Sequence, residues 1–256
     1  DRYDESRTET TSFSCESKLD SSSSLSQAIV WNGWGGKIGN TRHQAAETII
    51  NKGNVDQLAL KWAFAFPSAT RARSQPVVTP EVTYIGSQEG VIYALDNSSG
   101  CPWWTFSADA EVRGAIYVDT DELGIPETLL FGDFAASAYA INAQTGKLIW
   151  KKKVHDHPQA TLTGSVIAHD DIVIVPVSSL EVLLAARTEY SCCSFRGALV
   201  ALSISSGDEL WRTYTTDEPR PTIISTAGIQ QYGPSGAPIW SSPTIDAERN
   251  LVYAGT

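Results

Sequence analysis

Two neighbouring cysteines form the most unusual reactive pair in this sequence. Cys192 and Cys193 are half of its four cysteines, and Arg196 follows them closely. Neighbouring cysteines can stay reduced and pack as small hydrophobic groups. They can also form a disulfide, but consecutive Cα atoms lie only about 3.8 Å apart, below the usual disulfide separation of roughly 4.4 to 6.8 Å, so the ring is strained. The residues alone leave both states open.

Several other kinds of site are excluded by residue spacing and charge. No group of histidines and cysteines has zinc spacing, no Cys-x-x-Cys-His could attach a c-type haem, and no glycine-rich phosphate loop follows a predicted strand. The formal net charge is −10 and the basic residues are scattered, which argues against a nucleic-acid partner. No apolar run approaches about 18 residues, so no transmembrane segment is predicted.

The elements that must position these residues are mainly short strands. Residues 1–30 are rich in Ser, Thr, Asp and Glu, and we expect them to be a disordered lead-in. From residue 31, short runs of Val, Ile, Tyr and Thr alternate with Gly, Asp, Asn and Pro, which is typical of strands and tight turns. Only residues 44–53 and 54–62 are predicted to be helical. Because the chain contains no Met, we expect a mature form or a piece of a longer gene product.

An internal repeat predicts the architecture. Three segments share an Ala, a small polar residue two positions later, a Gly six positions later and a Trp ten positions later; they are residues 94–104, 140–150 and 201–211. The polar residue and the Gly predict a hairpin turn. The Trp lies on the following strand, where its ring can cover a neighbouring repeat.

The spacing of the repeats fits one four-stranded blade per copy, so the fold is predicted to be an all-β β-propeller. The predicted blades are 72–106, 110–152 and 161–213, with an incomplete blade at 238–256. Trp62 matches the outer strand of a preceding blade. We therefore expect residues 31–256 to form a partial propeller of about three and a half blades.

These residues resemble a known family. The repeat is similar to the tryptophan-docking motif of quinoprotein dehydrogenases, which use pyrroloquinoline quinone (PQQ) in an eight-bladed propeller. Cofactor-free propellers such as the outer-membrane assembly lipoprotein share that repeat. Six segments in the same order resemble polyvinyl alcohol dehydrogenase-like proteins more specifically: WNGWGGKIGNTRHQ, SGCPWW, HPQATLTG, VSSLE, CCSFRG and IWSSPTID. The resemblance extends from about residue 31 to residue 256.

The resemblance implies a PQQ site made from several of these segments. A Cys192–Cys193 disulfide would lie against one face of the planar cofactor, and Trp240 would stack on the other. Arg196 would reach the cofactor's oxygens, because PQQ carries three carboxylates and a quinone. The alternatives are a surface or inter-blade salt bridge for Arg196 and a core position for Trp240.

The resemblance also implies a calcium ion. Glu181 would ligate calcium, which takes roughly six to eight oxygen ligands, and Ser178 would donate a hydrogen bond to the cofactor. Ser179 stands where the broader family prefers Gly. The alternative for Glu181 is a solvated loop charge. The catalytic base, an Asp in the family, is not identified here and is expected outside this chain.

Other candidates have a structural interpretation that competes with the functional one. His157 and Thr163 match a family segment, but a structural loop is favoured. Arg113 either faces the channel or forms an inter-blade ion pair. Asn97 begins a formal glycosylation acceptor, although its place in a repeated turn favours a role in the turn. Finally, a second disulfide between Cys15 and Cys101 is predicted.

The expected function of the parent protein is oxidation of an alcohol, small or polymeric, by hydride transfer to PQQ with calcium as Lewis acid. An electron acceptor such as a cytochrome c is expected, and the disulfides favour a periplasmic or extracellular location. The 256-residue chain by itself is expected to be catalytically silent. The alternative function, from a different class, is a cofactor-free propeller that binds protein partners.

Overall fold

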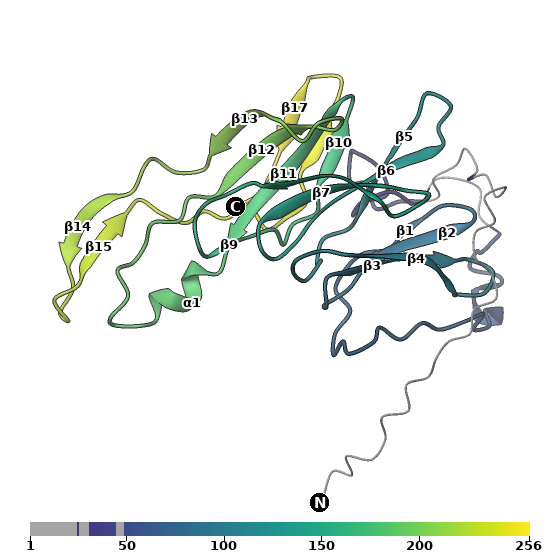
Figure 1. Cartoon of the computed structure of the whole chain (residues 1–256), viewed down its shortest axis with the longest axis horizontal. Coiled ribbons are helices and arrows are strands. Elements are labelled where there is room, and N and C mark those ends of the chain that lie inside the picture. The colour runs from purple at the N-terminus through teal and green to yellow at the C-terminus, as the bar shows by residue number, and fades with distance from the viewer. Residues whose placement is uncertain (1–24, 26–30, 45–48) are drawn as a thin grey trace, which may run out of the picture.

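The computed structural model describes residues 25, 31–44 and 49–256, which are mostly strands and loops (Figure 1). Apart from Leu25, the predicted lead-in lies outside the described residues. The strands are β1 Val77–Val78, β2 Val82–Gly86, β3 Val91–Asp96, β4 Pro102–Ser107, β5 Tyr117–Thr120, β6 Pro126–Gly132, β7 Ser137–Asn142, β8 Leu148–Lys153, β9 Ala160–Thr161, β10 Ile167–His169, β11 Ile172–Ser179, β12 Ala198–Ser203, β13 Glu209–Tyr214, β14 Arg220–Ile224, β15 Gln230–Gly233, β16 Thr244–Asp246 and β17 Leu251–Tyr253. Within the described ranges, the helices are η1 (Val55–Gln57) and α1 (Glu181–Ala185).

The strands form antiparallel sheets that follow one another along the chain (Figure 1). Strands β1–β4 form blade 1, β5–β8 form blade 2, and β10–β13 with β9 form blade 3. Strands β16 and β17 pair with each other as blade 4. Sheets made of consecutive strands and packed face against face are propeller blades, which confirms the predicted fold class.

Each repeat forms the hairpin predicted from its sequence. The Ala of the repeat pairs with the Trp across the two outer strands of its blade, as Ala94↔Trp104, Ala140↔Trp150 and Ala201↔Trp211. In the turn, the repeat Gly donates its N–H to the carbonyl of the polar residue and has a positive φ, as Gly146 does to Asn142 at 2.9 Å with φ +68°. Glycine populates this region without steric cost, which explains its place in the repeat.

The tryptophan rings join successive repeats. The ring of each Trp lies on the Gly of the following repeat, so closely that an added Cβ would be 2.6 to 2.7 Å from ring carbons; the pairs are Trp62 with Gly100, Trp104 with Gly146 and Trp150 with Gly207. Trp62 also donates to the carbonyl of Asn97, and Trp150 to that of Ile204. Trp150 is therefore 9% exposed, whereas Trp211, which has no such partner among the described residues, is 39% exposed.

The hydrophobic core is divided into layers between neighbouring blades. One cluster joins blades 1 and 2 through residues such as Tyr84 and Phe131. A second joins blades 2 and 3 through residues such as Leu130 and Val175. A smaller cluster, including Ile245, joins blades 3 and 4. Each inner blade thus buries both faces, which is the condition for stability in a repeat architecture.

The helix predictions were largely wrong. In 54–62 only the η1 turn is helical, and the rest of the segment runs to Trp62, whose docking on Gly100 fixes it. Of 44–53, residues 45–48 lie outside the described part and residues 49–53 are not helical. Helix α1, which was not predicted, follows β11 directly. The packing of the Trp62 ring on Gly100 thus outweighs the weak helix propensity of residues 54–62.

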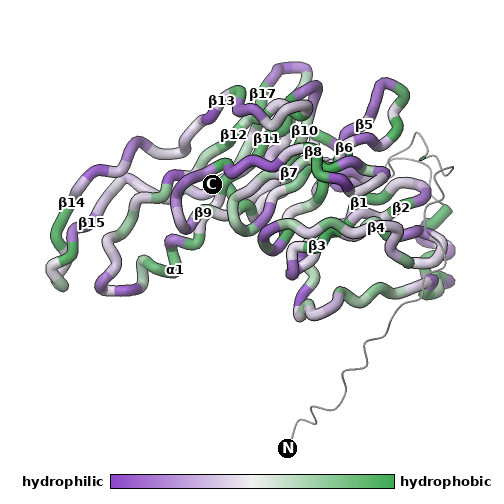
Figure 2. The backbone as a smooth tube through the Cα atoms, in the orientation of Figure 1, coloured by the Kyte–Doolittle hydropathy of each residue, from purple (hydrophilic) through white to green (hydrophobic). Residues whose placement is uncertain are grey.

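A hairpin of β14 and β15 projects from the stacked blades (Figure 1). Its Ile223 and Ile224 are each 69% exposed, and the hydrophobic colouring of β14 is visible in Figure 2. None of the helices in the described ranges has the length and apolar character needed to cross a bilayer.

Candidate functional site

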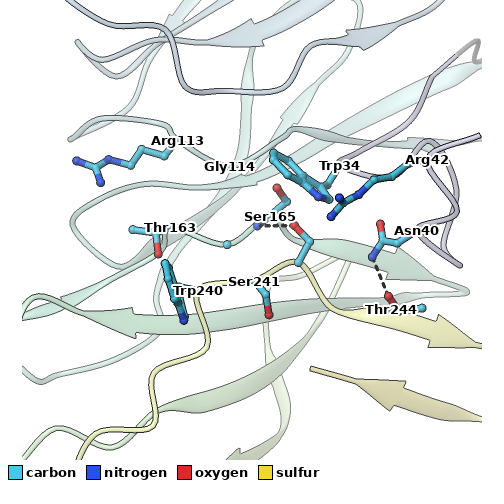
Figure 3. Close-up of a pocket in the computed structure, with 12 residues that line it drawn as sticks. Trp34, Asn40, Arg42, Arg113, Gly114, Thr163, Ser165, Trp240, Ser241 and Thr244 are labelled. Carbon is cyan, nitrogen blue, oxygen red and sulfur yellow. Dashed lines mark hydrogen bonds between the residues drawn. The ribbon is translucent and has the colours of Figure 1, made fainter. Parts of the chain in front are cut away.

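A cavity of about 510 Å³ opens where the first strands of several blades begin. This volume lies in the range of roughly 300 to 1,000 Å³ that is usual for small-molecule sites. Figure 3 shows its lining residues, which come from four separate segments. They are Trp34, Asn40, Arg42, Arg113, Gly114, Thr163, Gly164, Ser165, Trp240, Ser241, Ser242 and Thr244.

The blades approach one another closely at this cavity. An added Cβ at Gly114 would lie 2.9 Å from the carbonyl oxygen of Gly164, and one at Gly164 would lie 2.5 Å from that of Ser241. Side-chain hydroxyls bridge the same junctions, because Ser165 Oγ accepts from the N–H of Ala115 at 2.7 Å and Ser242 Oγ accepts from the N–H of Ser165 at 3.3 Å. The cavity wall is therefore a continuous hydrogen-bonded structure across blades 2, 3 and 4.

Residues 31–44, which we call the N-terminal strap, close another side of the cavity. The strap forms a bridge with Val78 of β1, exchanges hydrogen bonds with Val118 of β5 through the Asn32 amide, and accepts at the Ile38 carbonyl from Ile245 of β16. The Asn40 amide donates to the Pro243 carbonyl at 2.6 Å and to Thr244 Oγ1 at 2.9 Å. One segment thus contacts the first strands of blades 1, 2 and 4.

The cavity is positively charged although the whole chain carries a net charge of −10. Arg42 and Arg113 line it, and none of the twelve described lining residues is acidic. Arg113 Nε lies 3.1 Å from Glu111 Oε2, and its guanidinium lies 4.1 Å from the centre of the Phe134 ring. Burial raises the pKa of Glu111, but hydrogen bonds and charges from Arg71 and Arg113 outweigh it and hold that pKa below its usual value. Such a cavity favours an anionic occupant.

Two further residues give the cavity the features of a site for a planar polar ligand. Trp240 is 70% exposed and presents its ring beside Thr163 (Figure 3). Thr163 Oγ1 is buried and has no hydrogen-bond partner among the described residues. Because an unpaired buried hydroxyl is costly, it indicates a ligand atom that completes the bond. A tricarboxylate with an aromatic ring system, such as PQQ, fits this combination of guanidinium groups, indole rings and an unpaired donor.

The neighbouring cysteines form a disulfide, so the reduced-thiol interpretation was wrong. The disulfide lies beside β15, where Tyr232 donates to the Cys192 carbonyl at 2.7 Å and Cys193 donates to the Tyr232 carbonyl. It is not among the residues that line the cavity. Its predicted role as a cofactor lid stays a prediction. Cys15 lies outside the described residues, so the predicted bond from Cys15 to Cys101 also stays a prediction.

Glu181 is buried, not a solvated loop charge. Its Oε1 accepts from the Ser194 N–H at 2.8 Å and from the Tyr190 hydroxyl at 3.0 Å, and its Oε2 accepts from the Phe195 N–H at 2.9 Å. His157 Nε2 lies 3.5 Å from Oε1. A carboxylate has about four acceptor positions, and three are taken. Within the described part of the chain, no three His, Cys, Asp or Glu side chains are grouped as a metal site.

The remaining predicted residues lie outside the cavity lining. Arg196 stacks on the Tyr214 ring at 3.6 Å and donates twice to the Thr216 carbonyl, so its guanidinium is occupied locally. Ser178 is buried and pairs with Thr161. The cavity instead gathers Trp240 with Arg113 and Thr163, and it adds Trp34, Asn40 and Arg42 of the strap, which were not singled out in the sequence. The sequence feature that could have indicated these three residues is a glycine-rich segment that contains tryptophan, Asn and Arg.

Comparison with known proteins identifies the family of this chain. Residues 31–256 match the PQQ family described as glucose/ethanol/alcohol dehydrogenase, beta-propeller domain. The chain belongs to this PQQ family. It is 40% identical over 235 residues to a polyvinylalcohol dehydrogenase of a Pseudomonas species, covering 91% of this chain and 36% of that protein. It is 27% identical to a quinoprotein ethanol dehydrogenase of Pseudomonas aeruginosa, covering 80% of this chain and 37% of that protein.

Solved structures have the same fold. A quinohemoprotein alcohol dehydrogenase from Pseudomonas putida HK5 superimposes with a TM-score of 0.68 at 23% identity, covering 88% of this chain and 34% of that chain. The enzyme of the same class from Comamonas testosteroni gives a TM-score of 0.65 at 22% identity, with the same coverage of 88% and 34%. The PQQ-family chain described here thus spans about a third of the length of its relatives.

Proposed function

We propose that this chain supplies the cofactor pocket of a PQQ-dependent alcohol dehydrogenase and that PQQ occupies the cavity next to Trp240. The proposal is carried by one observation: a cavity with two guanidinium groups and no lining carboxylate contains a buried threonine hydroxyl with no partner. Family membership and the names of the relatives support an alcohol as the substrate.

Three residues of the cavity would contact the cofactor directly. Arg113, held by Glu111 and Phe134, would bind a carboxylate of the cofactor. Thr163 Oγ1 would donate a hydrogen bond to it, and the exposed ring of Trp240 would cover a face of its ring system. When bound, PQQ would supply an ortho-quinone that takes up two electrons and two protons as it becomes the quinol, which balances the oxidation of an alcohol to a carbonyl compound. The chain's own residues would bind and orient the cofactor.

Calcium takes roughly six oxygens or more, so amide carbonyl and cofactor oxygens would have to join the Glu181 carboxylate, which has a single acceptor position left. The role of Glu181 as a ligand stays a prediction. A polymeric or small alcohol, an electron acceptor such as a cytochrome c, and a periplasmic or extracellular location are further parts of the proposal; the disulfide Cys192–Cys193 supports the location, because disulfides persist in oxidising compartments.

Thr163→Val tests the pocket, because valine keeps the shape of threonine and removes the hydroxyl. We expect PQQ affinity, measured by isothermal titration calorimetry, to fall about 3- to 10-fold. The stability without ligand should stay the same or rise, because an unpaired buried hydroxyl is removed.

Thr216→Val is the matched control, since Thr216 Oγ1 is also buried without a described partner but does not line the cavity. It should leave PQQ affinity unchanged. Equal effects of the two variants would contradict the placement of PQQ. No binding of PQQ by the wild-type protein, and no alcohol-dependent dye reduction by the whole protein, would favour the cofactor-free scaffold.

A further inference from the structure

The N-terminal strap carries a guanidinium, that of Arg42, to the side of the cavity away from Trp240 and Thr163 (Figure 3). The guanidinium carbon of Arg42 lies 5.5 Å from the centre of the Trp34 ring, so the two side chains form one cation–π unit at that side. The cavity therefore has an indole and a guanidinium on each of two sides.

The backbone of the strap holds Arg42 in an unusual conformation. Asn40 and Arg42 have φ values of +48° and +54°, in the left-handed region that residues with side chains rarely adopt. The Arg42 N–H donates to the Gly35 carbonyl at 3.0 Å, and an added Cβ at Gly35 would lie 2.3 Å from Asn40 Cα. Because the Asn40 side chain is also bonded to residues 243 and 244, the loop that presents Arg42 is fixed before any ligand binds.

The charge of Arg42 is less compensated than that of Arg113. Glu111 pairs with Arg113, whereas no carboxylate of a described residue forms an ion pair with Arg42. Arg42 is solvent-exposed at the cavity lining, and its guanidinium contacts the Trp34 ring but no described carboxylate. In a chain with a net charge of −10, such a guanidinium on a backbone held in place by the strap favours a ligand anion.

We propose that Arg42 is a second anchor of this cavity and binds a carboxylate of the occupant at the end opposite Arg113 and Trp240. The proposal rests on the proposed function in that the physiological occupant is PQQ, a planar tricarboxylate that could offer one carboxylate to each guanidinium. Trp34 would pack against the same end of the ligand. The strap is then part of the binding site and not only a structural connection.

The test measures binding to the 256-residue chain by calorimetry and by quenching of tryptophan fluorescence, with PQQ and with benzene-1,3,5-tricarboxylate as probes. Arg42→Gln should weaken both about 10- to 100-fold, because a charge-assisted hydrogen bond is lost. Arg42→Lys should restore part of the affinity, since it keeps the charge without the fork. Arg249→Gln is the matched control; it removes an exposed arginine outside the cavity and should change nothing.

The outcomes separate this inference from the proposed function. If Arg113→Gln weakens PQQ binding and Arg42→Gln does not, the role of Arg42 is overturned while the PQQ pocket stands. If the wild type binds the tricarboxylate through Arg42 but does not bind PQQ, the anchor is supported and the cofactor assignment fails. Binding of neither probe overturns both. Unchanged thermal unfolding of Arg42→Gln and Arg42→Lys without ligand shows that any loss of affinity is not a loss of fold.

Discussion

At the scale of single residues, Glu181 illustrates how burial and partners define a role. Glu181 is 4% exposed, and its carboxylate accepts hydrogen bonds from the backbone of Ser194 and Phe195, directly after the disulfide. The Tyr190 hydroxyl, on the other side of the disulfide, donates to it as well. Glu181 therefore fixes both ends of the segment that carries Cys192 and Cys193.

Glu181→Gln should loosen this segment. The amide group of glutamine places an N–H against at least one of these donors, so we expect a loss of about 1 to 3 kcal/mol in the free energy of unfolding. Amide hydrogen exchange at residues 194 and 195 should become faster. Glu189→Gln, at an exposed position in the same loop, is the control and should leave that exchange unchanged. Equal protection in both variants would show that Glu181 does not hold the segment.

At the scale of elements, the repeat hairpins depend on the contact between Trp and Gly. Gly146→Ala combines a left-handed backbone, φ +68°, with a Cβ only 2.6 Å from the Trp104 ring. The expected loss in the free energy of unfolding is about 2 to 4 kcal/mol. Gly228→Ala provides the control, because Gly228 has φ +79° but nothing within 4 Å of an added Cβ.

The control should lose only about 1 to 2 kcal/mol, the cost of the backbone conformation. The difference between the two variants, measured by denaturant unfolding, isolates the docking of Trp104. If the two losses are the same, the ring contact contributes nothing.

The hairpins were predictable from sequence because the same pattern of residues repeats along the chain. The Ala-to-Trp spacing of ten residues predicted the hairpins, and Ala94 does pair with Trp104. The cavity was less predictable, because its parts are distant in sequence: the Asn40 amide and the Pro243 carbonyl are 203 residues apart. Arg113 and Thr163 were noticed without a decisive role, since single residues before a strand have no pattern of their own. Arg42 lies in a left-handed loop that local propensity does not reveal.

At the scale of the whole molecule, stability should depend on pH through Glu111, which joins Arg71, ahead of blade 1, to Arg113, at the start of blade 2. The arginines hold the pKa of Glu111 below its usual value of 4.5, against the effect of burial. The folded state therefore binds fewer protons at this site than the unfolded state. The stabilisation is present above the usual pKa and is lost as pH falls through the lower, folded pKa.

Glu111→Gln removes this dependence. We expect the free energy of unfolding of the wild type to fall more steeply than that of the variant when pH is lowered below about 4.5. Urea unfolding at a series of pH values measures both slopes. Parallel curves for the two proteins would contradict the assignment.

The contacts of the strap also determine when the cavity wall can form during synthesis of the chain. Asn40 leaves the ribosome about 200 residues before its partners at 243 and 244, and at roughly 5 to 20 residues per second the delay is about 10 to 40 s. Blades 1 and 2 can fold during that interval, because their contacts are local. The wall that carries Arg42 cannot form until residues 243 and 244 have emerged. A nascent chain therefore cannot capture the ligand early, and occupancy of the cavity would report that translation has passed residue 244.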